Sequence, residues 1–422
     1  MLKDQNNHKR AKLGVAVSAA AVLLAAGCSS SSKGATPSGS TGSGGPTYTV
    51  GLLTDLTGPA AATELDTPKG VEAGVGVARS EGYHIKYVVA DTGTSPAGAL
   101  TAAHKLVEQD HVFAVLAASA LTFAAAPYLA SQGVPVVGAA EDGSEWISTK
   151  SMFSIFGYQD FTKVGSTIGK FLHQEGGTVV GTVGTGISPS SAEAAKAAAV
   201  SAQVAGLKVG YVNANLPYGT TNVGPMAIAM KSAGVDSLVP AIDQVTAFAL
   251  IKALRTEGVN LKVALLPTGY GGDLVNGGPG AADAAQGVYF QTSWEPVEMH
   301  TAATIKLENA LKTYAGWSGD PTFGEYLGYL SVDGFVQGLK AAGPNPTRAS
   351  LINTMLGITN YSGAGLYGGH TISFAMSTRG QSFGADNCIW ATKFVGHTFQ
   401  VVQGAAPICG TIIPGKSVSA SS

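Results

Sequence analysis

The sequence predicts an α/β fold made of two doubly wound lobes. Three observations indicate it: short apolar runs alternate with alanine-rich amphipathic segments, this alternation is repeated in a second series, and strand-like segments return near the carboxyl terminus. Such alternation is typical of parallel sheets covered by helices on both faces. Ligands of these sheets bind beyond the carboxyl ends of the strands. Candidate functional residues are therefore expected directly after strands.

Residues 1–27 have the order of a secretory signal peptide, with a basic start, an apolar run from Leu13 to Ala26 and small residues at its end. The run is shorter than the ~20 residues that a membrane-spanning helix needs. Cys28 follows directly, so the segment resembles a bacterial lipoprotein signal, in which this cysteine is acylated. A plain secretory peptide with an incidental cysteine is the alternative. Residues 28–47, rich in Ser, Gly, Thr and Pro, are expected to form a flexible tether.

The two α/β series follow the tether. In the first, we expect strands at 48–53, 85–90, 112–116 and 134–137, and helices at 67–80, 95–109 and 123–131. In the second, we expect strands at 178–183, 208–213, 237–240, 263–266 and 288–291, and helices at 161–174, 191–205, 223–232, 245–257, 300–314 and 323–342. Residues 385–402 alternate like a hairpin that turns at Gly396-His397.

Charge and cysteine content limit the function classes. Charged residues make up 12 % of the chain and the formal net charge is −2, which gives no basis for nucleic-acid binding. Beyond Cys28, the remaining cysteines are Cys388 and Cys409, and a lone pair in an exported protein is most simply a disulfide. A metal pair is the alternative, but no histidine stands at zinc spacing and His397 is isolated. We expect no metal and no cofactor.

Enzyme signatures are not found. The sequence has no Gly-x-Ser-x-Gly elbow, no His-Glu-x-x-His motif and no P-loop. The segment Gly184-Thr-Gly-Ile-Ser-Pro lies between a strand and a helix, but Pro189 replaces the third glycine of a dinucleotide-binding loop. We therefore expect a binding protein and not an enzyme.

Several segments together resemble one family. Gly51-Leu-Leu-Thr-Asp-Leu-Thr-Gly-Pro59 is similar to the opening strand and loop of type I periplasmic solute-binding proteins of the leucine/isoleucine/valine-binding type, which serve ABC importers. Gly70-Val-Glu-Ala-Gly, Val115-Leu-Ala-Ala-Ser119 and Gly133-Val-Pro-Val-Val-Gly-Ala139 follow at the family's spacing. The segment from Tyr329 to Gly343 resembles a late helix. The similarity runs from about residue 48 to residue 410.

This resemblance implies two lobes that are joined by three crossovers, with the ligand cleft between them. The crossovers are expected near Phe156, Thr292–Trp294 and Tyr367. The first lobe would comprise residues 48–156 and 293–367, the second residues 157–292 and 368–412, and residues 413–422 would be a flexible tail.

In the first lobe, the resemblance places ligand contacts in the loops after two strands. Ser119, with Ala118 before it, would hold a carboxylate or amide, although capping of the next helix requires the same residue type. Ala139 and Ala140 would contribute backbone. Glu141 stands where amino-acid binders usually have threonine, and its carboxylate would repel a carboxylate but attract an ammonium; an exposed loop acid is the alternative. Thr63 is a weaker candidate.

In the second lobe, Ser188 and Ser190 are candidate contacts. Asp243 stands where the family often has tyrosine, and its alternative role is to cap the next helix. Tyr270 lies near the position of the acid that usually binds an α-ammonium; it would stack on the ligand or only plug the loop. Aromatic residues are candidates for closing the cleft, with burial in the core as the alternative: Phe323, Tyr326 and Trp294.

The expected function is a lipid-anchored, monomeric receptor outside the cytoplasmic membrane, which captures a small polar organic ligand by lobe closure and delivers it to the permease of an ABC importer. An aliphatic or branched-chain amino acid, or a related metabolite, is the favoured ligand class. The alternatives are a sensor or structural lipoprotein of the same fold and, less favoured, an unrecognised hydrolase.

Overall fold

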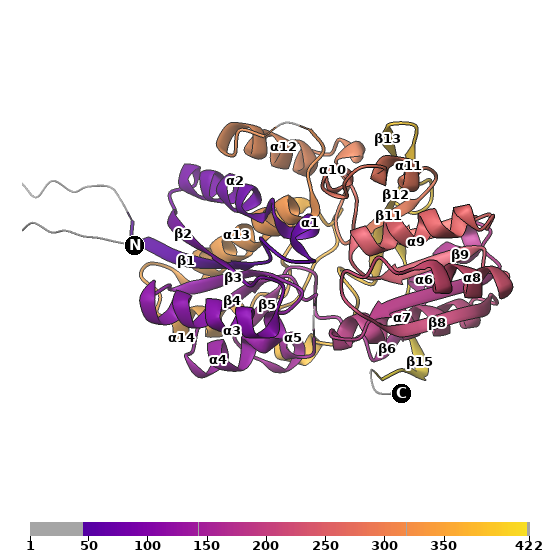
Figure 1. Ribbon diagram of the computed structural model, residues 1–422. Coiled ribbons are helices and arrows are strands. Elements are labelled where there is room, and N and C mark those ends of the chain that lie inside the picture. Colours follow the sequence, from indigo (N-terminus) through magenta and orange to yellow (C-terminus); the bar gives the residue numbers. More distant parts are fainter. Residues whose placement is uncertain (1–44, 142, 318, 420–422) are drawn as a thin grey trace, which may run out of the picture. The chain divides into compact units, whose positions relative to one another are not determined.

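The computed structural model describes residues 45–141, 143–317 and 319–419, which form two α/β lobes, each built on its own sheet (Figure 1). The predicted signal peptide at residues 1–27, Cys28 and the tether up to residue 44 lie outside the described residues. Among the helices that are described, none is long and apolar enough to cross a bilayer.

The first lobe has a five-stranded parallel sheet with the strand order β2-β1-β3-β4-β5. Every residue of β3 and β4 is buried, as expected for parallel strands that are covered on both faces. Since all five strands run the same way, their carboxyl ends meet at one edge. The strands are β1 (Thr47–Thr54), β2 (His84–Asp91), β3 (Ala114–Ala118), β4 (Val136–Gly138) and β5 (Met152–Ser154).

Helices cover both faces of this sheet, with α2 and α12 on one side and α3 and α4 on the other (Figure 1). Helix α13, from much later in the chain, packs along α2. The two helices meet so closely that a Cβ on Gly70 would lie 2.1 Å from the carbonyl oxygen of Glu325, and one on Gly328 2.3 Å from that of Thr67. The helices of this lobe are α1 (Ala61–Glu64), α2 (Thr67–Ser80), α3 (Pro96–His104), α4 (Ala126–Ser131), α5 (Glu145–Ser148), α12 (Ala302–Tyr314), α13 (Phe323–Ala342) and α14 (Arg348–Met355).

The second lobe has a sheet of the order β13-β12-β11-β10-β9-β7-β8, in which β12 and β13 are antiparallel to their neighbours. A hairpin therefore completes this sheet from the end of the chain, as the sequence predicted. The strands are β7 (Val179–Thr185), β8 (Lys208–Leu216), β9 (Ser237–Ala241), β10 (Val263–Leu266), β11 (Tyr289–Thr292), β12 (Cys388–Val395) and β13 (Thr398–Val401). The helices are α6 (Thr167–Gln174), α7 (Pro189–Val204), α8 (Gly224–Ser232), α9 (Gln244–Thr256), α10 (Asp273–Asn276) and α11 (Ala281–Ala285).

Three segments cross between the lobes, and they lie side by side. The Tyr367 hydroxyl donates a hydrogen bond to the carbonyl oxygen of Ile155, which joins the third crossover to the first. The backbone nitrogen of Glu295, in the second crossover, donates to the carbonyl oxygen of Leu366 at 2.7 Å. Hydrogen bonds therefore connect the first segment to the third and the second to the third.

Two linked sequence-based expectations are wrong, besides elements such as β5 and α14 that were not expected. The predicted helix at 161–174 is split, because β6 (Lys163–Gly165) precedes α6. Its antiparallel partner is β15 (Ile412–Ser417), in the segment that we expected to be a flexible tail from residue 413. Neither strand is predictable alone, because each is short and its partner lies at the other end of the lobe's sequence.

Candidate functional site

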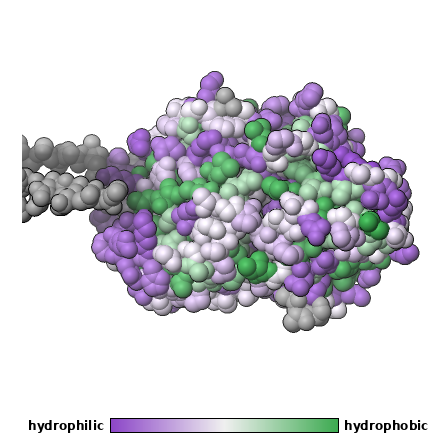
Figure 2. Space-filling view, in the orientation of Figure 1, coloured by the Kyte–Doolittle hydropathy of each residue, from purple (hydrophilic) through white to green (hydrophobic). Residues whose placement is uncertain are grey.

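A cavity of about 320 Å³ lies between the two lobes, and residues that follow strands of both sheets line it. This is the position where parallel sheets bind ligands. On the face seen in Figure 2, hydrophilic residues gather toward the two ends and apolar or neutral ones over the middle, where the lobes meet. The lining residues that directly follow strands include Ala120, Ala140, Glu141, Phe156, Tyr218, Ile242, Asp243, Pro267, Thr268, Ser293 and Trp294.

Among the described residues, three carboxyl side chains line the cavity: Glu64 at the end of α1, Glu141 after β4, and Asp243 before α9. In the part of the chain that the structure describes, no Lys, Arg or His side chain lines it. Glu64 is only 1 % exposed, and its Oε2 accepts a hydrogen bond of 3.0 Å from the Thr67 hydroxyl. Within those same ranges, Oε1 of Glu64 and Oε1 of Glu141 have no hydrogen-bond partner. The lining therefore offers unsatisfied acceptors.

Burial and neighbouring charges raise the pKa values of the acids that line the cavity on the first lobe. Burial raises the pKa of Glu64 well above its ordinary value, and the charges of Glu141 and Asp55 raise it further. Burial, together with the charge of Asp55, raises the pKa of Glu141 to about 8. Both shifts have the same physical cause, because burial without a counter-charge disfavours the ionised form of a carboxyl.

Ser119 lies behind the cavity wall. Its hydroxyl donates a hydrogen bond of 2.8 Å to Oδ1 of the buried Asp55 and accepts one of 3.1 Å from the backbone nitrogen of Leu121. The other oxygen of Asp55 accepts from the backbone nitrogen of Ala120 at 3.2 Å, and the Thr92 hydroxyl donates to Oδ1. Ser119 thus fixes Asp55 and the following turn, and it is Ala120 that reaches the cavity.

Asp243 caps α9, which is the alternative role that the sequence suggested for it. Its Oδ1 accepts a hydrogen bond of 2.9 Å from the backbone nitrogen of Thr246, and its Oδ2 accepts from the Thr246 hydroxyl at 2.8 Å and from the backbone nitrogen of Gly219 at 3.2 Å. Both oxygens are therefore satisfied, although the side chain also lines the cavity. Ser188 caps α7 in the same way by accepting from the backbone nitrogen of Ser191 at 3.3 Å.

Hydrogen bonds join the lobes beside the cavity. The Ser190 hydroxyl, in the second lobe, donates to the carbonyl oxygen of Glu141 at 3.2 Å. Nε2 of Gln244, also in the second lobe, donates to the carbonyl oxygen of Ala62 at 2.9 Å. Both acceptors belong to the first lobe, so the cavity is enclosed from two sides.

Three aromatic rings form another part of the wall. Phe156 and Trp294 have ring centroids 5.2 Å apart, and Phe323 lies 5.9 Å from the first and 5.6 Å from the second. These residues belong to two crossovers and to the start of α13. Tyr326 stacks on Trp294 at 4.9 Å from outside the cavity.

The structure brings most, but not all, of the candidate residues to the cavity. Tyr270 is in the core, where its hydroxyl donates to Oε2 of Glu298 at 2.6 Å and accepts from the backbone nitrogen of Val297 at 3.0 Å. The Tyr270 side chain therefore fills the interior beneath its loop and does not line the cavity. The candidates that line the cavity are Thr63, Ala140, Glu141, Ser188, Ser190 and Asp243. Those behind the wall are Ala118, Ser119, Ala139 and Tyr270.

Sequence reasoning missed many of the lining residues, among them Glu64, Tyr218 and Gln291. Glu64 is an acid in the alanine-rich segment after Gly58-Pro59, and only its burial against the second lobe distinguishes it. Tyr218 and Gln291 lie after or within strands of the second sheet. The rule that sites follow strands pointed to the loop of Tyr218, but no residue pattern singled it out.

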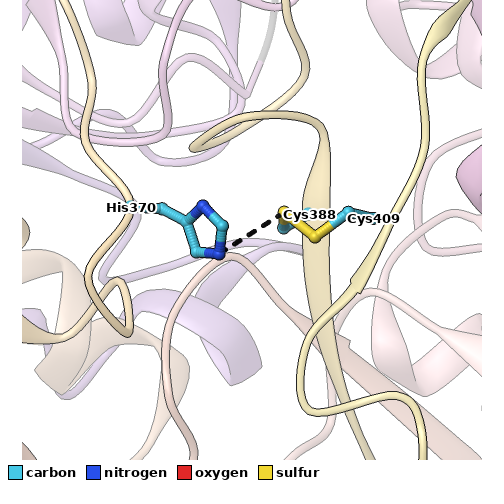
Figure 3. Close-up of side chains that lie close together, drawn as sticks. All are labelled: His370, Cys388 and Cys409. Atoms are coloured by element: carbon cyan, nitrogen blue, oxygen red, sulfur yellow. Dashed lines mark hydrogen bonds between the residues drawn. A yellow bond between two sulfur atoms is a disulfide. The ribbon is translucent and has the colours of Figure 1, made fainter.

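The predicted disulfide between Cys388 and Cys409 is present, and it joins β12 to β14 (Ile408–Cys409) (Figure 3). Nε2 of His370 lies 3.9 Å from Sγ of Cys388, while its Nδ1 contacts Oδ2 of Asp386 at 3.0 Å. The histidine and the two sulfurs are close enough together for a metal site, but the disulfide occupies both sulfurs. Cys388 also lines the cavity, so the disulfide braces its wall.

Comparison with known proteins agrees with this geometry. The sequence profile of a family described as periplasmic binding protein matches residues 47–397. The structure is similar to a leucine-binding protein LivK from Thermotoga maritima, with 17 % identity, coverage of 86 % of this chain and 99 % of the other, and a TM-score of 0.70.

The descriptions of two further similar structures name a bound ligand. The branched-chain amino acid transporter substrate-binding protein LivJ from Streptococcus pneumoniae, in complex with isoleucine, has 18 % identity, coverage of 85 % and 99 %, and a TM-score of 0.67. A solute-binding protein of an ABC transporter from R. palustris, in complex with 4-hydroxybenzoate, has 18 % identity, coverage of 87 % and 98 %, and a TM-score of 0.70. Comparison with curated protein sequences gave no significant match.

Proposed function

Because the chain belongs to the periplasmic binding protein family, we propose that it is an extracytoplasmic receptor that captures a small organic solute between its lobes and delivers it to an ABC importer. The observation that carries this proposal is the cavity of about 320 Å³ that residues of both lobes line. In the proposed division, residues 48–156 and 293–367 form the first lobe, and residues 157–292 and 368–412 the second.

Lobe closure would couple the ligand to the importer. A ligand that contacts both lobes stabilises the closed arrangement, since it gains its full set of contacts only there. The hydrogen bond from Gln244 to Ala62 at 2.9 Å and that from Asn276 to Asp66 at 2.9 Å support this arrangement. The side-by-side crossovers are the natural hinge, because a small rotation in each would separate the lobes.

The candidate ligand contacts are the predicted residues that line the cavity: Thr63, Ala140, Glu141, Ser188, Ser190 and Asp243. An aliphatic amino acid, or a related small metabolite, is the class that the sequence favours. The similar structures bind leucine, isoleucine or 4-hydroxybenzoate according to their descriptions, so the fold accommodates more than one class.

We further propose that acylated Cys28 anchors the receptor to the membrane and that it acts as a monomer beside the permease. Metabolic labelling with a radioactive fatty acid tests the anchor. Label on the unaltered chain and none on Cys28→Ser would support it, whereas equal labelling would exclude this residue.

A thermal-shift screen of the full chain against amino acids, amides, aromatic acids and amines tests the receptor function. We expect at least one class to raise the melting temperature by several degrees. Uptake of that solute should be lost when the gene is deleted and restored by the unaltered gene. Unchanged uptake would contradict a transport role.

A further inference from the structure

The carboxyl groups around the cavity have no cationic partners among the described residues. Among the described residues, none of the three lining carboxyls takes part in an ion pair. Two more carboxyls, Asp55 and Asp273, are fully buried behind the wall, and they are equally unpaired within the described ranges. Asp273 accepts only from the backbone nitrogens of Phe323 at 3.2 Å and Gly269 at 3.4 Å. Burying this many carboxyls is costly unless a positive charge joins them.

Five lining residues in the described part of the chain have a buried polar atom without a hydrogen-bond partner: three oxygens on Glu64, Glu141 and Gln291 that can accept, the hydroxyl of Thr268, and the donor Nε1 of Trp294. Oε1 of Glu64, Oε1 of Glu141 and Oε1 of Gln291 have no hydrogen-bond partner in the part of the chain that is described, and all three residues line the cavity. A ligand that satisfies them must donate hydrogen bonds. An alkylammonium group has up to three donors and a full positive charge.

The remaining wall suits the rest of such a molecule. The faces of Trp294, Phe156 and Phe323 are aromatic surfaces on which a cation is attracted by the ring quadrupole. The cavity continues along apolar side chains of the second lobe, which would cover a hydrocarbon chain. These apolar residues include Ala194, Ala197, Ala198, Val239 and Ile389.

We propose that the solute is an organic cation, in which an alkylammonium group is held by Glu64 and Glu141 and a hydrocarbon chain lies against the aromatic and apolar wall. This inference rests on the proposed receptor function and names its substrate class. From the described lining residues, a benzoate or another anion would meet three carboxyls and no cationic side chain. The raised pKa values of Glu64 and Glu141 agree with it, because a bound cation would lower both pKa values by favouring the ionised carboxylates.

Isothermal titration calorimetry on the full chain tests the class of ligand. The probes are putrescine, spermidine and n-pentylamine, compared with uncharged 1-pentanol and with leucine, isoleucine and 4-hydroxybenzoate. We expect binding of at least one amine, at least about tenfold tighter than the alcohol or any carboxylate.

Variants then test the residues. Glu64→Gln and Glu141→Gln keep the shape of the side chain, remove its charge, and should each weaken amine binding by roughly 10- to 100-fold. Glu308→Gln, on α12 and away from the cavity, is the matched control and should bind like the unaltered chain. Melting curves without ligand establish that each variant is folded. If one of the two glutamate variants does not fold, the other still tests the proposal.

The outcomes separate this inference from the proposed function. If leucine or 4-hydroxybenzoate binds and no amine does, the cation assignment is overturned and the receptor function stands. Amine binding that neither glutamate variant weakens also overturns the assignment. If no probe of any class binds and the screen finds no other ligand, both proposals fall.

Discussion

The hydroxyl of Ser190 donates a hydrogen bond of 3.2 Å to the backbone carbonyl oxygen of Glu141, and this bond joins the N-terminus of α7 in the second lobe to the loop after β4 in the first. Since Glu141 also lines the cavity, the same loop both joins the two lobes and forms part of the cavity wall. A change in Ser190 should therefore alter closure while the carboxyl of Glu141 is kept.

Ser190→Ala removes this bond between the lobes. We expect ligand affinity to fall by about 0.5–1.5 kcal/mol, the usual net contribution of one hydrogen bond. Calorimetry with the solute found in the thermal-shift screen measures the change. Ser232→Ala is the control, because Ser232 is an exposed residue of α8 whose hydroxyl donates to the carbonyl oxygen of Ile228 in the same helix. Equal affinities of both variants would show that the Ser190 bond plays no part in closure.

The disulfide between Cys388 and Cys409 closes a loop with a sequence separation of 21. Replacing both cysteines by alanine should lower the free energy of unfolding by about 3 kcal/mol, because the unfolded chain regains the entropy of that loop. Urea unfolding of the two proteins measures the difference. A reductant should destabilise the unaltered chain and leave the stability of the double variant unchanged. If the reductant also destabilises the double variant, the loss of stability does not come from breaking this disulfide.

The buried acids make stability depend on pH between about 4.5 and 8. The folded protein holds the proton of Glu141 up to its raised pKa of about 8, whereas the unfolded chain loses it near the ordinary value of 4.5. The folded state therefore binds more protons in this window, so the free energy of unfolding falls as the pH rises through it. Burial raises the pKa of Glu298 and of Glu325 to about 7, which acts in the same direction.

Glu141→Gln cannot lose a proton, so its stability should change less steeply with pH than that of the unaltered chain. Denaturant unfolding at intervals from pH 4.5 to pH 8, without ligand, measures both slopes. Parallel curves would mean that Glu141 titrates normally in the folded protein.

The close approach of α2 and α13 depends on glycine. Gly328→Ala would place its Cβ 2.3 Å from the carbonyl oxygen of Thr67 and force the helices apart. We expect a loss of about 1–3 kcal/mol in unfolding free energy. Gly224→Ala, in α8, meets no atom within 4 Å and should be neutral or slightly stabilising. A Gly328→Ala variant as stable as Gly224→Ala would refute the packing argument.

Much of the fold was predictable because its elements carry local signals. Helix α13 begins after Thr322, whose side chain and that of Glu325 form a capping box, and the predicted bounds 323–342 match. Strand β10 also matches its predicted bounds, 263–266, because it is a short, fully apolar run between turn residues. Strand β6 was missed because its pairing with β15 is long-range and leaves no periodicity in either segment.

The site was less predictable, because a strand end fixes a loop but not the direction of each side chain. Ser119 and Tyr270 were expected at the cavity, yet the first is turned toward Asp55 and the second toward Glu298. Glu64 reaches the cavity only because the second lobe closes over α1, a contact that no local pattern encodes.

Helix α13 has a consequence for the order in which the protein becomes native. The sheet of the first lobe is synthesised early, but the helix that packs along α2 emerges only after the parallel strands of the second lobe. Until then, strands β3 and β4 lack the helix that packs on them beside α2, so this lobe does not reach its final stability as a nascent chain. Such a delay would help a polypeptide that must cross a membrane in the unfolded state, because a stably folded amino-terminal half would resist translocation.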